Sequence, residues 1–148
     1  MATWGEFAAS APELAAFGAE RFRTAEVAYL ATIRGGRRPR VHPITPILAS
    51  DRLFLFMEPT SPKGHDLRRN GHFALHSLVP DQHGSGGEFL ISGKARPVDD
   101  PSTRGAACAA ARYEPEDRYV LFELSVEEAS STVYDAQGLP VRKHWRKA

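Results

Sequence analysis

Residues 27–57 read VAYLATIRGGRRPRVHPITPILASDRLFLFM, and this stretch decides the fold. It holds three apolar runs, separated first by a Gly-Gly pair and then by an Asp-Arg pair. Apolar runs of this length, joined by short Gly and Asp turns, are typical of an antiparallel meander. Pro43 and Pro46 fall in the second run. Because proline cannot donate a hydrogen bond to a ladder, this strand belongs at an edge, a bulge or a barrel seam.

Further strands and three short helices are expected on both sides of this meander. Apolar patterning predicts strands over 72–79, 88–98 and 119–126, with shorter pieces at 131–134 and 141–145. Helices are expected at about 12–22, 62–70 and 100–112, each with a proline near its start. Short helices and tight strand connections argue against a parallel βαβ repeat. The sequence therefore predicts one mainly β domain over residues 1–148, an antiparallel six- to eight-stranded barrel with peripheral helices.

The composition is that of an ordinary globular protein. Hydrophobic residues make up 42% of the 148 residues, and the net charge is +1. A nucleic-acid-binding protein usually carries a large basic excess, so we expect no nucleic acid partner. No run approaches the roughly 20 apolar residues of a membrane helix, so we expect no membrane partner. One cysteine excludes an internal disulfide, and no signal peptide is recognisable, so we expect a cytoplasmic protein.

The segment 58–69, EPTSPKGHDLRR, carries the clearest chemistry. It lies where a strand leads into a helix, whose first turn offers free N–H groups and the positive end of the dipole. Thr60 and Ser61 add hydroxyl groups. Lys63 stands in that first turn, where a cation opposes the dipole at a cost of about 0.3–1 kcal/mol. A bound phosphate would compensate for this cost, with Lys63 as its counter-charge and Gly64 leaving room for its approach.

Other interpretations of the basic residues stay open at this point. Lys63 could instead point into water or pair with Glu58. Arg40 enters the proline-containing strand, where it could face a ligand or have a structural role. Arg68 and Arg69 fall in the last helical turn, where cations stabilise a helix anyway. The other arginines before this strand are Arg34, Arg37 and Arg38, and such a run usually lies in a solvent-exposed turn.

The six histidines do not predict a metal site. His72 and His76 are four residues apart, which in a strand spans about 13 Å, so they cannot share one ion. No Ser/His/Asp or Cys/His catalytic arrangement is recognisable, and Cys108 in an alanine-rich helix is typical of a small buried hydrophobe. The catalytic residues are therefore unassigned, with His42 or His76 as the candidate proton donor.

The two tryptophans lie near opposite ends of the chain. Trp4 is interpreted as a hydrophobic anchor. Trp145 lies in the basic tail RKHWRK, which has two readings: a frayed end, or a ring that stacks on a planar ligand with a cation near a phosphate.

The order of these motifs resembles the pyridoxamine 5'-phosphate oxidase-like family, the FMN-binding split β-barrels. The segments that carry the resemblance are AYLATI, the turn after it, RVHPI, LFLFM, SPKGHDLRR and the alternating strands through residue 98. The resemblance covers roughly residues 11 to 145. It implies a split β-barrel and a homodimer with two cofactors at the subunit interface.

The resemblance also implies a cofactor site. Lys63 matches the phosphate-binding lysine of the family, and Ser61 falls where many members carry an Arg or Ser of the same grip. The strand that runs along the isoalloxazine ring corresponds to Arg40, Val41, His42 and Pro43. Further implied contacts are Phe56 and Met57 beside the ring, His76 and Ser77 on a neighbouring strand, and the C-terminal aromatic Trp145.

Two departures set this chain apart from the vitamin B6 oxidase proper. Pro62 stands where that enzyme has a basic residue, and its C-terminal substrate-binding segment is not recognisable. The short, Ala- and Arg-rich chain is more similar to actinobacterial members, many of which use coenzyme F420 in place of FMN.

These features together lead to an expected function. A flavin performs the redox chemistry itself, while the protein binds and orients it. We expect an FMN-dependent oxidoreductase that moves hydride to or from a small organic substrate. One alternative is an F420-dependent reductase, whose acidic cofactor tail would use Arg37, Arg38 or Arg68. The other alternative is a flavin- or haem-binding module without turnover.

Overall fold

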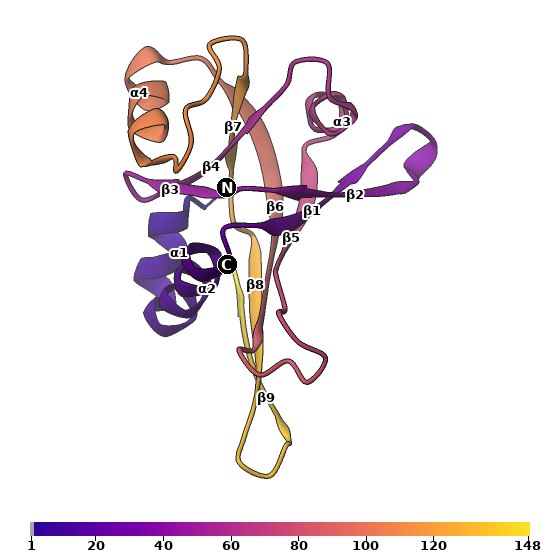
Figure 1. Cartoon of the computed structure of the whole chain (residues 1–148), viewed down its shortest axis with the longest axis vertical. Helices are drawn as coiled ribbons and strands as arrows, with labels where there is room; N and C mark the ends of the chain where they lie inside the picture. The colour runs from indigo at the N-terminus through magenta and orange to yellow at the C-terminus, as the bar shows by residue number, and fades with distance from the viewer. Residues whose placement is uncertain (1) are drawn as a thin grey trace.

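A curled antiparallel sheet forms the centre of the molecule, as the computed structural model of residues 2–148 shows (Figure 1). The helices of these residues are α1 (Trp4–Ser10), α2 (Pro12–Ala25), α3 (Pro62–Arg69) and α4 (Pro101–Ala110), with a short 3-10 turn at Gly35–Arg37. The strands are β1 (Ala28–Ile33), β2 (Pro39–Ile44), β3 (Ile47–Ala49), β4 (Arg52–Met57), β5 (His72–Ser77), β6 (Glu88–Val98), β7 (Val120–Leu124), β8 (Glu128–Tyr134) and β9 (Pro140–Arg146). No helix in this part of the chain is both long and apolar enough to cross a membrane.

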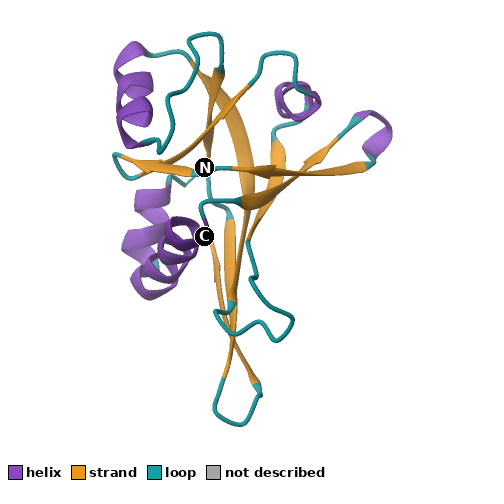
Figure 2. Ribbon diagram, in the orientation of Figure 1, coloured by secondary structure: helices purple, strands orange, loops and turns teal. Residues whose placement is uncertain are grey.

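The strands run in the order β2-β1-β5-β6-β7-β4-β3, with β8 paired to β6 and β9 paired to β8 (Figure 2). The long strand β6 makes the sheet curl, since it pairs with β8 over residues 88–92 and with β7 over residues 95–98. Gly93 lies between these two pairings, where an added Cβ would lie 2.0 Å from the carbonyl oxygen of Ser125. Glycine at this bend therefore lets the two parts of the barrel approach each other.

The mainly β, antiparallel architecture confirms the fold expected from the sequence, with corrections of detail. There are nine strands in residues 2–148, where six to eight were predicted. One cause is the bend at Thr45 and Pro46, which divides the single strand expected over 40–48 into β2 and β3.

The helix α1 is a feature that the sequence analysis missed. A capping box starts it, in which Thr3 Oγ1 accepts from the Glu6 N–H (3.1 Å) and the Glu6 carboxylate accepts from the Thr3 N–H (2.7 Å). The Thr-x-x-Glu spacing is a known local signal for a helix start. The helix buries Trp4 and Phe7 against the barrel.

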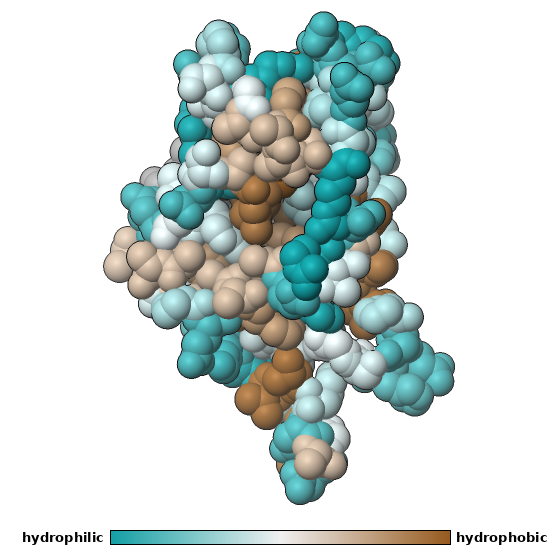
Figure 3. All heavy atoms as spheres, turned by 60° about the vertical axis from the view of Figure 1, so that its left-hand side comes forward, coloured by the Kyte–Doolittle hydropathy of each residue, from teal (hydrophilic) through white to brown (hydrophobic). Residues whose placement is uncertain are grey.

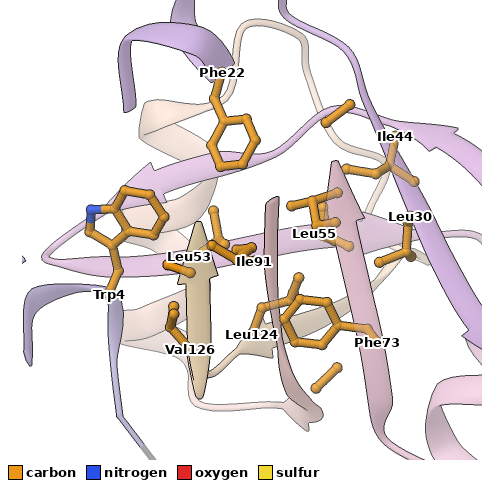
Figure 4. Packing of buried hydrophobic residues seen from close by; sticks show 14 of the residues in the cluster. Trp4, Phe22, Leu30, Ile44, Leu53, Leu55, Phe73, Ile91, Leu124 and Val126 are labelled. Carbon is orange, nitrogen blue, oxygen red and sulfur yellow. The ribbon is translucent and has the colours of Figure 1, made fainter. Parts of the chain in front are cut away.

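An apolar core fills the inner face of the curled sheet (Figure 4). Aromatic rings of α1 and α2 close one side of it, with the Trp4 and Phe22 rings 6.1 and 5.6 Å from that of Phe89. Burial of each large side chain stabilises the fold by about 1.5–3 kcal/mol. Trp4 is 6% exposed, which confirms it as a hydrophobic anchor. A smaller cluster beneath α4 contains Ile47, Phe54, Val98, Ala107 and Leu121.

The register of the ladders decides which residues face this core. His42 on β2 lies opposite Leu30 on β1, and the same row continues through Leu75, Ile91 and Ala129 to Trp145 on β9. Because side chains alternate between the two faces of a strand, Arg40 and His42 point to the inner face and Val41 and Pro43 to the outer face.

Candidate functional site

A buried carboxylate, that of Asp66 on α3, fastens this helix to the barrel. The side chain is 1% exposed and accepts three hydrogen bonds. The donors are Thr32 Oγ1 on β1 (2.7 Å), Arg40 Nε on β2 (2.8 Å) and Arg69 Nη2 one turn further along α3 (3.0 Å). Thr32 and Arg40 are cross-strand partners, so one carboxylate holds β1, β2 and α3 together.

Asp66 stays ionised because of these donors. Burial alone would raise the pKa of the Asp66 carboxyl. The hydrogen bonds from Thr32 and Arg40, and the charges of Arg40 and Arg69, outweigh burial and hold this pKa below its ordinary value. The carboxylate therefore fixes the direction of the Arg40 guanidinium, whose Nε it binds. In the described chain this bond leaves both terminal nitrogens of Arg40 for another partner.

The helix α3 begins as the sequence predicts. Ser61 is its N-cap and accepts a hydrogen bond from the Gly64 N–H (3.1 Å), while Pro62 occupies the first turn. A Cβ on Gly64 would lie 2.9 Å from Ser61 Oγ and 3.7 Å from Met57 Sδ. The space beside Gly64 is thus taken by the chain itself, and the reason for glycine is the packing of the cap.

Lys63 is a half-buried cation in this first turn with no counter-charge of its own. Glu58, the acid proposed to neutralise it, is bound instead by Arg118, whose Nε donates to both carboxylate oxygens at 3.1 Å. Within residues 2–148, Lys63 forms no ion pair. The pairing of Lys63 with Glu58 is therefore wrong, and the cation faces the positive end of the helix dipole uncompensated.

The imidazole of His42 lies close to both cations. Burial lowers the pKa of His42, and the charges of Lys63 and Arg40 lower it further, so the ring is neutral at pH 7. Its Nε2 is buried and has no hydrogen-bond partner, one of two such side-chain atoms in residues 2–148. An unpaired buried polar atom is costly, and such atoms in native proteins call for an explanation, such as a ligand. The cations Arg40 and Lys63 and the unpaired Nε2 of His42 are thus near one another, a combination of groups suited to an anion.

Several other residues expected at the site lie around this cluster or away from it. Met57 is buried beneath α3, and Thr60 is exposed in the turn before the helix. Val41 and Pro43 are exposed on the outer face of β2. Phe56 faces away toward α4, where the Arg104 guanidinium lies 5.1 Å from its ring centre.

His76 and Ser77 lie on β5, two strands from β2. His76 faces outward, with Nδ1 2.6 Å from the Ser77 carbonyl oxygen and Nε2 3.7 Å from the Glu88 carboxylate. Ser77 is buried, and its Oγ accepts a hydrogen bond from the Phe89 N–H (3.0 Å). Ser77 therefore completes the strand pairing between β5 and β6.

Trp145 has a structural role within the protomer. Its Nε1 donates to Ser10 Oγ (2.8 Å), and its ring lies 4.9 Å from that of Phe7. The strand β9 is fully paired with β8, so the reading of this tail as a frayed end is wrong. In the register row Trp145 stands five strand spacings from His42, roughly 24 Å along the sheet. Its described contacts are with Ser10 and Phe7, so Trp145 is not part of the cluster around His42.

Thr32 and Asp66 are site residues that the sequence analysis did not identify. The local signal for Asp66 is weak: it is the single acid in the basic helix PKGHDLRR. Residues 2–148 contain no group of three His, Cys, Asp or Glu side chains placed to hold a metal ion.

The curled antiparallel sheet and the site at α3 define a split β-barrel protein. The sequence profile described as pyridoxamine 5'-phosphate oxidase matches residues 15–132. The chain belongs to the pyridoxamine 5'-phosphate oxidase family. No curated protein matches it.

Solved structures share the fold at low sequence identity. A NimC/NimA family protein from Clostridium acetobutylicum has a TM-score of 0.65 at 17% identity, over 86% of this chain and 90% of that chain. PhzG from Burkholderia lata, solved with tetrahydrophenazine-1-carboxylic acid, has a TM-score of 0.66 at 18% identity, over 93% and 84%. A heme-binding protein from Mycobacterium smegmatis has a TM-score of 0.65 at 17% identity, over 86% of this chain and 57% of that chain.

Proposed function

We propose that this chain binds FMN, with the phosphate at Lys63 and the start of α3, and transfers hydride between the flavin and a small organic substrate. The observation that carries the proposal is the uncompensated Lys63 beside the unpaired, buried Nε2 of His42. Both features are unfavourable for the protein alone, and a bound phosphate would relieve both. Family membership supports flavin as the carrier of that phosphate.

Each residue of the cluster has a defined part in binding. Lys63 supplies the counter-charge, and its own N–H can donate to a phosphate oxygen. The other N–H groups of this turn are not available, since Pro62 has none, the Gly64 N–H binds Ser61 Oγ and the His65 N–H binds the Ser61 carbonyl oxygen. The hydroxyl hydrogen of Ser61 is available to the same group, since the oxygen accepts the cap hydrogen bond. Arg40 is held by Asp66 and directs its free terminal nitrogens toward the ligand. His42, neutral at pH 7, can donate or accept through Nε2.

The strand β2 suits the planar part of the cofactor. It is an edge strand, so the backbone groups on its open side are free, and Pro43 has no N–H to offer a further strand. The bound flavin would supply the hydride chemistry. The chain's part is to hold the ring along residues 40–43, with Arg40 able to stabilise negative charge that develops on it.

A homodimer completes this proposal. Three apolar side chains are exposed on the outer face, on β2, β1 and β6: Val41 (63%), Tyr29 (40%) and Leu90 (39%). Exposed apolar residues gathered on one face are typical of an interface. A second copy that covers this face would also cover His76, which lies between Tyr29 and Leu90 in the same row.

An F420-dependent reductase is the second candidate, supported by the arginines of the β1–β2 turn. Arg34, Arg37 and Arg38 form no ion pair in residues 2–148, and all three are exposed. They lie next to Arg40, so an acidic extension of a cofactor bound at Lys63 would meet three more cations.

The absorption spectrum of the purified protein and mass spectrometry of what it carries test these candidates. A bound flavin supports FMN, and tight binding of added F420 without flavin supports the deazaflavin. A haem Soret band, or a flavin that no substrate can oxidise or reduce, would favour a non-catalytic binding module. Lys63→Ala is expected to weaken FMN binding by about tenfold or more, and Lys147→Ala, outside the site, to leave it unchanged.

A further inference from the structure

A second concave site lies between α2, α4 and the bend that joins β2 to β3. It is a pocket of about 270 Å³. Its lining consists of Ala19, Phe22, Arg23, Glu26, Thr45, Pro46, Ile47, Leu48, Ala110 and Arg112. Figure 3 turns this side forward and shows hydrophobic side chains (brown) at a hollow, with strongly hydrophilic ones (teal) beside it.

The floor of the pocket is apolar and rigid. Phe22 and Ile47 are 5% and 3% exposed and belong to the two hydrophobic clusters, so the core holds both in place. Small side chains, Ala19 on α2 and Ala110 on α4, leave the volume open. An apolar floor with polar groups around it is a form that small-molecule sites take, and this volume suits a small ligand such as a single ring.

The mouth of the pocket carries an ion pair between Glu26 and Arg112 (2.8 Å). The two residues follow the ends of α2 and α4, and their side chains are 63% and 43% exposed. Glu26 adopts a left-handed backbone (φ 64°), which is uncommon for a residue other than glycine. Exposed ion pairs contribute little to stability. A ligand carboxylate can therefore replace Glu26 at Arg112 at small cost.

The pocket lies beyond the end of β2, the strand that carries Arg40 near its start. From Arg40 to Thr45, the first lining residue after β2, the extended chain covers about 16 Å. A ring held along residues 40–43 would thus lie on the strand whose end leads into this pocket.

We propose that the pocket binds a small, mainly apolar molecule with one carboxylate group, which pairs with Arg112 in place of Glu26. Its further assignment as the substrate pocket rests on the proposed flavin function. Ring and carboxylate are recognised by different parts of the pocket, the ring by Phe22 and Ile47 and the carboxylate by Arg112.

The test uses benzoate as probe and benzyl alcohol as its neutral counterpart, with the full chain free of cofactor. Titration followed by amide NMR is expected to show benzoate binding with shifts at the lining residues, and benzyl alcohol binding about two- to fivefold more weakly, as expected for a partly exposed ion pair. Arg112→Gln is expected to reduce benzoate affinity about two- to fivefold. Glu26→Gln is expected to increase it, since the competing carboxylate is removed. Arg142→Gln, an exposed cation on β9, is the matched control and should change nothing.

The opposite results overturn the proposal: equal affinity for the two probes, or benzoate binding that Arg112→Gln leaves unchanged. Lys63→Ala separates this proposal from the flavin site, because it should weaken FMN binding and leave benzoate binding intact. If FMN binds while benzoate does not, the pocket proposal fails and the proposed function stands. With FMN bound, benzoate is expected to perturb the visible flavin spectrum in the wild type and not in Arg112→Gln. An unperturbed spectrum overturns the assignment as the substrate pocket alone.

Discussion

Arg40 Nε on β2 lies 2.8 Å from the buried carboxylate of Asp66 on α3. This ion pair connects β2 and α3, the two elements of the proposed anion site. The same carboxylate accepts from Thr32 on β1. The arrangement holds the Arg40 guanidinium near His42, whose pKa its charge lowers. Binding then requires little reordering of this side chain, which favours affinity.

Replacing Asp66 by Asn tests the contribution of this ion pair to stability. Asp66→Asn keeps the size of the side chain and removes the counter-charge of Arg40 and Arg69. We expect a loss of about 2–3 kcal/mol in the free energy of unfolding, below the range for a fully buried pair because both arginines are partly exposed. Urea unfolding measures it. Glu20→Gln, in the exposed pair with Arg23, is the control and should leave the urea midpoint unchanged.

Lys63→Ala is expected to move stability and binding in opposite directions. The lysine opposes the dipole of α3 and lacks an ion pair in residues 2–148, so its removal should raise the free energy of unfolding by about 0.3–1 kcal/mol. The same change should weaken FMN binding. Thermal unfolding with and without FMN measures both effects. A variant that loses stability and binds FMN normally would contradict the phosphate site.

The pKa of His42 is expected to report on the bound anion. Burial, then the charges of Lys63 and Arg40, hold the pKa of His42 below its ordinary value in the free protein. The unfolded chain takes up the proton near pH 6.5. Since the unfolded state then binds more protons, the free energy of unfolding falls as the pH drops below about 6.5 and is unaffected above it.

A phosphate at Lys63 would place negative charge beside the imidazole and raise the pKa of His42. Two-dimensional NMR of the imidazole, with and without FMN, measures the change. His42→Gln identifies the signal and should remove this part of the pH dependence of stability. A pKa of His42 that stays the same in saturating FMN would place the phosphate elsewhere.

Two helical glycines form a matched pair for the packing of the barrel. A Cβ on Gly18 of α2 would lie 2.4 Å from the ring of Phe89. A Cβ on Gly105 of α4 would have no atom of residues 2–148 within 4 Å, apart from its chain neighbours and the backbone of its own helix. We expect Gly105→Ala to stabilise the protein by about 0.5–1 kcal/mol through helix propensity. Gly18→Ala should destabilise it by about 1–3 kcal/mol through overpacking. Thermal unfolding of the two variants measures both changes in stability. Melting temperatures that shift in the same direction in both variants would refute the prediction.

The sequence predicted those parts of the fold that depend on local patterns. The pairings of β1 with β2 and of β3 with β4, and the cap of α3 at Ser61, follow from turn and capping residues within a few positions. The continuous meander was wrong, because the bend at Pro46 places the two hairpins at opposite ends of the strand order. The bend at Pro46 and the Thr3–Glu6 capping box also had local signals, and they were overlooked.

The centre of the candidate site depends on contacts between distant residues. Thr32 and Asp66 are 34 positions apart, and Arg40 and Asp66 are 26 apart. The periodicity of the sequence cannot show that Asp66 contacts Thr32 and Arg40. These contacts depend on the register of β1 against β2 and on where α3 packs. The unpaired Nε2 of His42 is likewise a property of the packed structure. Only the charge of Lys63, unfavourable at its own helix end, could be recognised from the sequence.

The outer face of the sheet provides the test of the homodimer. Val41 is 63% exposed on the edge strand β2, beside Tyr29 on β1. A stable dimer buries about 800 Å² on each partner, and a carboxylate at the centre of such a face would be left desolvated and unpaired. We expect Val41→Asp to yield a monomer that remains folded, since this side chain is not part of the core. Analytical ultracentrifugation measures the mass in solution, with Ser102→Asp on the exposed side of α4 as the control. If the cofactor lies between two copies, FMN binding should fall together with the dimer; an FMN-binding monomer would show that one copy alone forms the site.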